Sequence, residues 1–178
     1  MRRHVAWRAA VVRRLLAHTH STSQPSSRNV LIDTASSEVV VSGLSMPHSP
    51  RWHGGRLWLL ESGRGTLCTV DLASGNVDAV AALPGFTRGL AFAGDVAFVG
   101  LSQIRESPTF GDLPLIGRLQ ERQSGVWMVD LRSGAVIGFL RFDDLVQEIF
   151  DVALLPGVRF PEIAEPADDR TLQSYVLP

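Results

Sequence analysis

One short motif occurs three times in the chain, and it limits the available folds more than any other feature. Its copies are Asp33-Thr34-Ala35-Ser36-Ser37, Asp71-Leu72-Ala73-Ser74-Gly75 and Asp130-Leu131-Arg132-Ser133-Gly134. In each copy an apolar run ends in Asp, a turn follows, and a second apolar run begins. An Asp carboxylate accepts hydrogen bonds from turn amides, and glycine adopts the positive φ that such turns require. The motif therefore predicts the same strand–turn–strand hairpin at three places.

A second segment repeats alongside this motif. Residues 48–54 align without gaps on residues 88–94, and the alignment places Trp58 on Phe98. A partial third copy covers residues 150–154. A period of roughly forty residues, with four strands per unit and matched aromatic residues, is typical of β-propeller blades.

From residue 29 onwards the chain consists of short apolar runs separated by turns, which predicts an all-β fold. We expect antiparallel propeller-like blades that form a partial propeller, preceded by a short N-terminal helix. Strands are predicted over 29–33, 38–42, 47–53, 56–62, 66–72, 76–83, 87–93, 95–101, 126–131, 135–142 and 149–155. Two nearly complete blades are fewer than the roughly four to eight that close a propeller. The blade faces left open should be apolar and prone to self-association.

Three segments differ from this repeat in composition. Residues 1–28 form an Arg-rich amphipathic leader and a Ser-rich linker, and residues 161–178 form an acidic tail that we expect to be loosely ordered. Residues 102–124 interrupt the repeat as a long inserted loop with room for one short helix. The partial propeller is therefore assigned to residues 29–160.

Charge is unevenly placed, although the formal net charge is only -1. All basic residues are arginine, and six of them precede the first acidic residue, Asp33. The acidic body argues against a nucleic-acid-binding surface, and no apolar stretch is long enough for a membrane span. We expect a cytoplasmic protein, or a mitochondrial one if the leader is a transit peptide.

Several motifs resemble those of a known family. They are Gly43–His53, Leu83-Pro84-Gly85, Arg88–Phe92, Val99–Ser102, Asp130–Gly134 and Asp151–Val158. They resemble an uncharacterised, mostly bacterial family, domain of unknown function 4915, some members of which carry tetratricopeptide repeats. The resemblance covers about residues 30–160 and implies a propeller-like all-β fold with no established activity. Because it implies a longer upstream half, we expect this chain to be a truncated member with an unrelated leader.

The candidate site follows from the start of each blade. The first strand of a propeller blade begins near the central axis, and the equivalent starts here carry His48, Arg88, Glu148 and Asp151. We expect these side chains to approach one channel mouth. An imidazole, a guanidinium and two carboxylates could bind an anionic ligand or perform acid–base chemistry. The alternative is a structural network that joins adjacent blades.

Other chemistries fit the sequence less well. His48 and His53 are expected on opposite faces of one strand unless a bulge intervenes, and His53 beside a Gly-Gly turn is expected to be an exposed turn residue. We therefore expect no metal site and no cofactor. The serines lack a Gly-x-Ser-x-Gly elbow, and no Gly-rich phosphate loop opens a helix. Cys68 is expected to be a small buried strand residue.

These observations favour a non-enzymatic binding or protein-interaction module of unknown ligand. The expected partner is a small polar ligand or a protein, with self-association through the exposed blade faces. One alternative is a propeller hydrolase, lyase or isomerase that acts on a small polar or anionic substrate at the central channel. Another alternative is an inactive truncated fragment.

Overall fold

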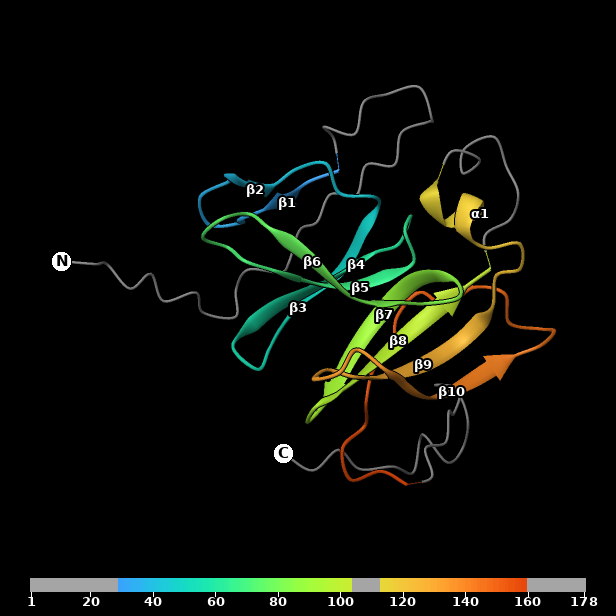
Figure 1. Cartoon of the computed structure of the whole chain (residues 1–178). Helices are drawn as coiled ribbons and strands as arrows, with labels where there is room; N and C mark the ends of the chain where they lie inside the picture. Colours follow the sequence, from blue (N-terminus) through green and yellow to red (C-terminus); the bar gives the residue numbers. More distant parts are fainter. Residues whose placement is uncertain (1–28, 104–112, 160–178) are drawn as a thin grey trace, which may run out of the picture.

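Two four-stranded antiparallel sheets form most of the computed structural model, which describes residues 29–103 and 113–159 (Figure 1). The first sheet has the order β3-β4-β5-β6, with β3 (Pro47–His53), β4 (Arg56–Glu61), β5 (Thr66–Val70) and β6 (Val77–Ala82). The second runs in sequence from β7 (Phe86–Ala93) through β8 (Val96–Ser102) and β9 (Ser124–Asp130) to β10 (Val136–Phe142). A small hairpin of β1 (Leu31–Ile32) and β2 (Val39–Val41) forms a third sheet.

The predicted all-β class is confirmed, since three antiparallel sheets and one short helix make up the described residues. The helix, α1 (Pro114–Arg118), lies inside the predicted insert. The predicted N-terminal helix lies outside the described residues. No helix in the described ranges is long and apolar enough to cross a membrane.

The strand predicted over residues 149–155 is wrong, because this segment forms no strand ladder. Side chains hold part of its backbone instead. The Ile149 N–H donates to Ser102 Oγ at 2.8 Å, and the Val152 N–H donates to the Asp151 carboxylate at 2.9 Å. A sequence pattern alone does not distinguish a segment of this kind from a strand that pairs with a neighbour.

The three Asp turns have the same hydrogen bonds. The N–H of Asp33, Asp71 and Asp130 donates across each hairpin at 2.9 Å. Each Asp carboxylate accepts from the amide two residues later, at 2.8 or 2.9 Å. The fifth motif position is left-handed every time, with φ of 61° at Ser37, 75° at Gly75 and 72° at Gly134. The turns therefore identify β1–β2, β5–β6 and β9–β10 as equivalent strand pairs.

The sheets are stacked, and two apolar cores separate them. The core between the two large sheets includes Trp58, Leu60 and Leu67 from the first sheet with Val99 and Trp127 from the second. The other core joins the opposite face of the first sheet to the β1–β2 hairpin; it contains Leu31, Val41, Leu44, Leu57, Leu59, Cys68 and Val70. Figure 1 shows the hairpin and the second sheet on opposite sides of the first sheet.

Candidate functional site

Three segments meet at one edge of the stacked sheets: β3 and β7, the first strand of each large sheet, which we call the inner strands, and residues 147–152, which we call the third segment. Ser49 Oγ on β3 accepts a hydrogen bond from the Gly89 N–H on β7 at 3.0 Å. Gly89 in turn lies against the third segment, because a Cβ built there would stand 2.7 Å from Asp151 Cα. β3 therefore contacts β7, and β7 contacts the third segment.

The inner strands carry the same irregularity at equivalent places. The β3–β4 register shifts between His48 and Arg51, and the β7–β8 register shifts between Thr87 and Leu90. Ser49 has φ 48° and Gly89 has φ 83° inside these bulges. A left-handed serine is strained, and a β-bulge re-aims the side chains beside it. The bulges therefore set the directions of the side chains at the start of each inner strand.

Hydrogen bonds to the Nδ1 nitrogen hold the His48 ring in place. Its Nδ1 lies 3.0 Å from the Met46 carbonyl oxygen and 2.7 Å from Ser62 Oγ. A carbonyl only accepts, and the Ser62 hydroxyl gives its single proton to the Thr87 carbonyl. Nδ1 is therefore the protonated nitrogen, and in the neutral ring Nε2 carries the lone pair.

The electrostatics of His48 favour this neutral form. Burial lowers the pKa of the imidazole below its ordinary value, and the nearby Arg88 charge lowers it further. The hydrogen bond to Met46 opposes the shift but is the smallest of the three effects. At neutral pH, His48 is therefore a hydrogen-bond acceptor through Nε2, and it lies in the field of the Arg88 charge.

The structure brings some of the predicted site residues together more closely than others. Arg88 acts on His48 by its charge, and its guanidinium lies 4.5 Å above the centre of the Phe150 ring. Asp151 pairs with Arg51 of β3 at 3.7 Å. Glu148 is exposed in the third segment. Charge therefore links Arg88 to His48, whereas an ion pair links Asp151 to Arg51.

Sequence reasoning missed Ser62, Arg51 and Phe150. A signal for Ser62 was present, because the gap-free alignment places it on Ser102. Ser62 donates to the Thr87 carbonyl, and Ser102 donates to the Ile149 carbonyl at 3.1 Å. Ser62 therefore joins the end of β4 to β7, and Ser102 joins β8 to the third segment.

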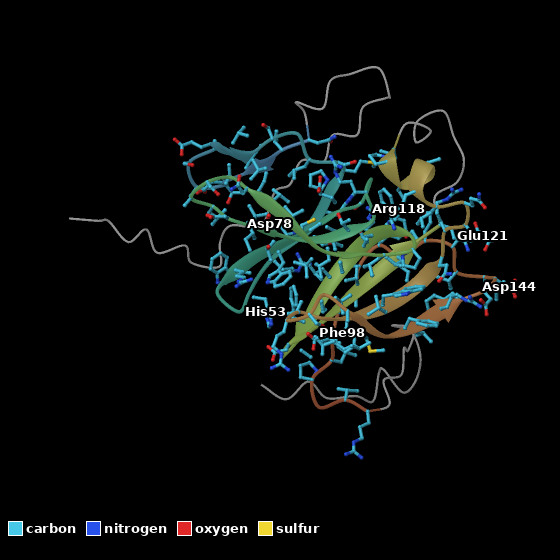
Figure 2. The ribbon with its side chains drawn as sticks, in the orientation of Figure 1. His53, Asp78, Phe98, Arg118, Glu121 and Asp144 are labelled. Atoms are coloured by element: carbon cyan, nitrogen blue, oxygen red, sulfur yellow. The ribbon has the colours of Figure 1, made fainter. Side chains whose placement is uncertain are left out.

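His53 differs from its prediction. It is half-buried; its Nε2 lies 2.7 Å from the Gly94 carbonyl oxygen, and its ring stacks on Phe92 at 4.3 Å. Figure 2 shows it at the β3–β4 turn, next to the β7–β8 hairpin. The bulge in β3 lets both His48 and His53 contact β7, but at opposite ends of the strand. Within the described ranges, no group of three or more His, Cys, Asp or Glu side chains could hold a metal ion.

The helix α1 covers the same end of the molecule as His48. Its Leu115 is fully buried in a small core with Phe86 and Met46, and Phe86 meets the His48 ring edge-on at 5.8 Å. Arg118 fixes the helix by donating to the Leu83 carbonyl at 2.7 Å. The α1 part of the insert therefore packs against Phe86, which contacts the His48 ring.

A cavity of about 650 Å³ lies apart from this cluster, between β2, β6, the β4–β5 turn and α1. Its charged lining residues include Glu61 and Arg64, which pair with each other at 3.2 Å. Cys68 nearby is fully buried, as predicted, and burial raises the pKa of its thiol to about 11. The thiol is therefore a packing group and a poor nucleophile.

The fold and the site define a repetitive antiparallel β protein with a polar cluster at the ends of its inner strands. A family model described as a domain of unknown function (DUF4915) matches residues 13–164. The chain belongs to this family. A search of curated proteins found no match.

Proposed function

We propose that the stacked sheets are successive blades of a propeller-like array. The strongest support is that the same packing relation occurs twice. The Val40 carbonyl of β2 lies at Gly75, the turn glycine of the first sheet, and the Val80 carbonyl of β6 lies at Gly134, the turn glycine of the second. Repeating blades stack in this way around a common axis, with their first strands innermost.

On this scaffold, we propose a binding module for a small anion that also carries a hydroxyl or amino donor. The observation that supports this most directly is the oriented, neutral His48 beside Arg88. Nε2 would accept the donor hydrogen of the ligand, and the guanidinium would pair with its carboxylate or phosphate. No hydrogen bond to Nε2 is found among the described residues, so this acceptor is available in the described part of the chain.

A second candidate function rests on the same neutral imidazole, which could remove a proton from a bound substrate. This lyase or isomerase chemistry would use Nε2 as a base and Arg88 to stabilise negative charge. A serine-hydrolase mechanism through Ser62 is disfavoured. Its hydroxyl is fully buried, and its proton is committed to the Thr87 carbonyl.

Titration with malate followed by ¹⁵N NMR of the histidine rings would test the binding proposal. Malate has carboxylates and a hydroxyl, whereas inorganic phosphate is the comparison anion. We expect malate to shift the His48 Nε2 signal saturably, and we expect Arg88→Ala to weaken binding by about tenfold or more, as for loss of a charge-assisted hydrogen bond.

Arg132→Ala is the matched control. Arg132 lies in the β9–β10 turn and forms an exposed ion pair with Asp95 of the β7–β8 turn. This variant should bind as the wild type does. Equal shifts in the wild type and Arg88→Ala, or no saturable response to either anion, would overturn the proposal. Turnover of a screened substrate that His48→Ala abolishes would instead support the enzymatic candidate.

A further inference from the structure

The two large sheets present equivalent faces to very different surroundings. The face of the first sheet that turns towards the second carries Trp58, Leu67 and Ala81, all of which are buried. Leu67 pairs with Ala81 in the first sheet, and Val126 pairs with Leu140 in the second. Counting back from Asp71 and Asp130, Leu67 and Val126 hold the same position. Val126 and Leu140 therefore mark the corresponding face of the second sheet.

The inner part of this second face is already covered. A Cβ built on Gly100 would meet side-chain atoms of Ile149 at 2.8 Å and of Val152 at 3.0 Å. Gly100 pairs with Val126, so the third segment lies on the same face. It thus occupies the place that β7 occupies on the first sheet.

The outer part of the face is open. Leu140 is 59% exposed, whereas Ala81 at the corresponding place on the first sheet is 7% exposed. Phe98, which corresponds to the buried Trp58 and is labelled on β8 in Figure 2, is only half-buried. The outer part therefore lacks a cover among the described residues.

The opposite end of the stack has a complementary open face. In the β1–β2 hairpin, Leu31 pairs with Val41, and both are buried against the first sheet. The next pair, Ile32 and Val39, follows a shift in register, so Val39 does not share the buried face of Val41 although the two residues are two positions apart. Val39 is 58% exposed. The hairpin therefore offers a small apolar face that the first sheet does not cover.

We propose that a second copy of this chain packs head to tail, with its β1–β2 hairpin on the Val126–Leu140 face of the first copy. The hairpin is an outer strand pair by its Asp turn, and the third segment is the inner element of a unit. Each end of the stack thus supplies the half-unit that the other end lacks. The contact would continue the internal sheet-to-sheet interface, and it rests on the repeat alone, independently of the ligand site.

A head-to-tail contact joins two different surfaces, so it can be dissected by substitution. Val39→Asp would disable the hairpin face, and Leu140→Asp would disable the sheet face. Both residues are mostly exposed, so both variants should fold. Sedimentation velocity should show concentration-dependent association of the wild-type chain and a monomer for each variant alone.

Mixing the two variants gives the decisive result. Each retains the face that the other has lost, so the mixture should form a 1:1 complex that does not grow further. Val136→Asp is the matched control, because Val136 lies on β10, is 44% exposed, and pairs with the buried Val129 on the face turned towards the first sheet. This variant should associate as the wild type does.

Three outcomes would overturn the proposal. The first is a wild-type chain that stays monomeric up to high concentration, which would leave the face to another protein or to further sequence. The second is association that survives in Val39→Asp alone, which would indicate a sheet-face to sheet-face dimer. The third is a mixture of folded variants that stays monomeric.

Discussion

The first and second sheets are built from the same strand order, Asp turn and inner-strand bulge, yet they differ in what surrounds them. The first sheet is covered on both faces, by the β1–β2 hairpin and by the second sheet. The second sheet is covered by the first sheet around Trp127 and Val129 on one face, and by the third segment around Gly100 on the other, while Phe139 and Leu140 of β10 stay exposed. The difference shows that the position of a unit in the stack, and not its sequence pattern, decides which residues form a core.

The inner strands repeat this contrast at a smaller scale. His48 and Arg88 occupy equivalent positions in the alignment, and one is an imidazole whose pKa is lowered by burial while the other is a guanidinium. The residue that follows each is left-handed, but it is Ser49 in one strand and Gly89 in the other. Glycine is needed at the second place because the third segment lies directly against it.

The largest expected effect contrasts equivalent residues of the two sheets. Leu67→Ala should lower the free energy of unfolding by about 3 kcal/mol, since a fully buried leucine leaves a cavity. Val126→Ala should cost about 1 kcal/mol or less, because its face is only partly covered. Urea unfolding followed by circular dichroism would measure both. Equal losses would contradict the difference in burial.

A smaller difference in stability is expected between alanine substitutions of two left-handed glycines, Gly89 on β7 and Gly94 in the β7–β8 turn. Gly89→Ala should cost about 2–3 kcal/mol, because the new Cβ would stand 2.6 Å from the Val152 backbone nitrogen. Gly94→Ala has a similar positive φ but open space around it, so it should cost about 1 kcal/mol. Thermal unfolding would compare them. Equal losses would show that the third segment does not press on Gly89 in solution.

His48 should make the free energy of unfolding depend on pH, which an arginine at the equivalent position cannot do. Its folded pKa lies below the ordinary value of 6.5, so between these two values the unfolded chain binds more protons than the folded one. Stability is therefore fully present above about pH 6.5 and falls as the pH drops towards the folded pKa. His48→Gln should flatten this slope in urea midpoints measured from pH 8 to pH 5. His53→Gln is the control and should keep the slope.

The smallest expected effect concerns the Asp turns. Hydrogen bonds from turn amides lower the pKa of Asp71 and Asp130. A lowered carboxylate pKa contributes stability that is present above the ordinary value, about pH 4, and is lost as the pH falls through the folded value. Asp130→Asn should therefore remove a slight acid dependence. An unchanged slope below pH 4 would contradict the role of the turn amides.

Much of the fold could be predicted because the repeated turns depend on interactions between residues close in the sequence. An Asp followed by small polar residues and a left-handed position forms the same turn wherever it occurs, so Asp71 and Asp130 located their strand pairs correctly. Matched residues such as Trp58 and Phe98 aligned the inner halves. These signals need no information about distant partners.

The rest depends on contacts that the pattern does not contain. Residues 149–155 have strand-like composition, but in the structure their backbone bonds to Ser102 Oγ and Asp151 and forms no ladder. Likewise, the bulge near Ser49 brings both His48 and His53 to β7, whereas regular alternation predicts opposite faces. The predicted grouping of His48 with Arg88 stays a prediction, and the tautomer of His48 depends on Ser62 in the β4–β5 turn and on Thr87 of β7.

The most direct test of the repeat is a comparison of two equivalent contacts by nuclear Overhauser spectroscopy. Ser62 meets Thr87 and Ser102 meets Ile149 in the same way, because each serine hydroxyl donates to the inner segment of the next unit. If the sheets and the third segment are successive units, both serines should show cross-peaks from their β protons to the backbone of these partners. Cross-peaks for Ser62 but none for Ser102 would contradict the account, because the third segment would then not occupy the inner place of a following unit.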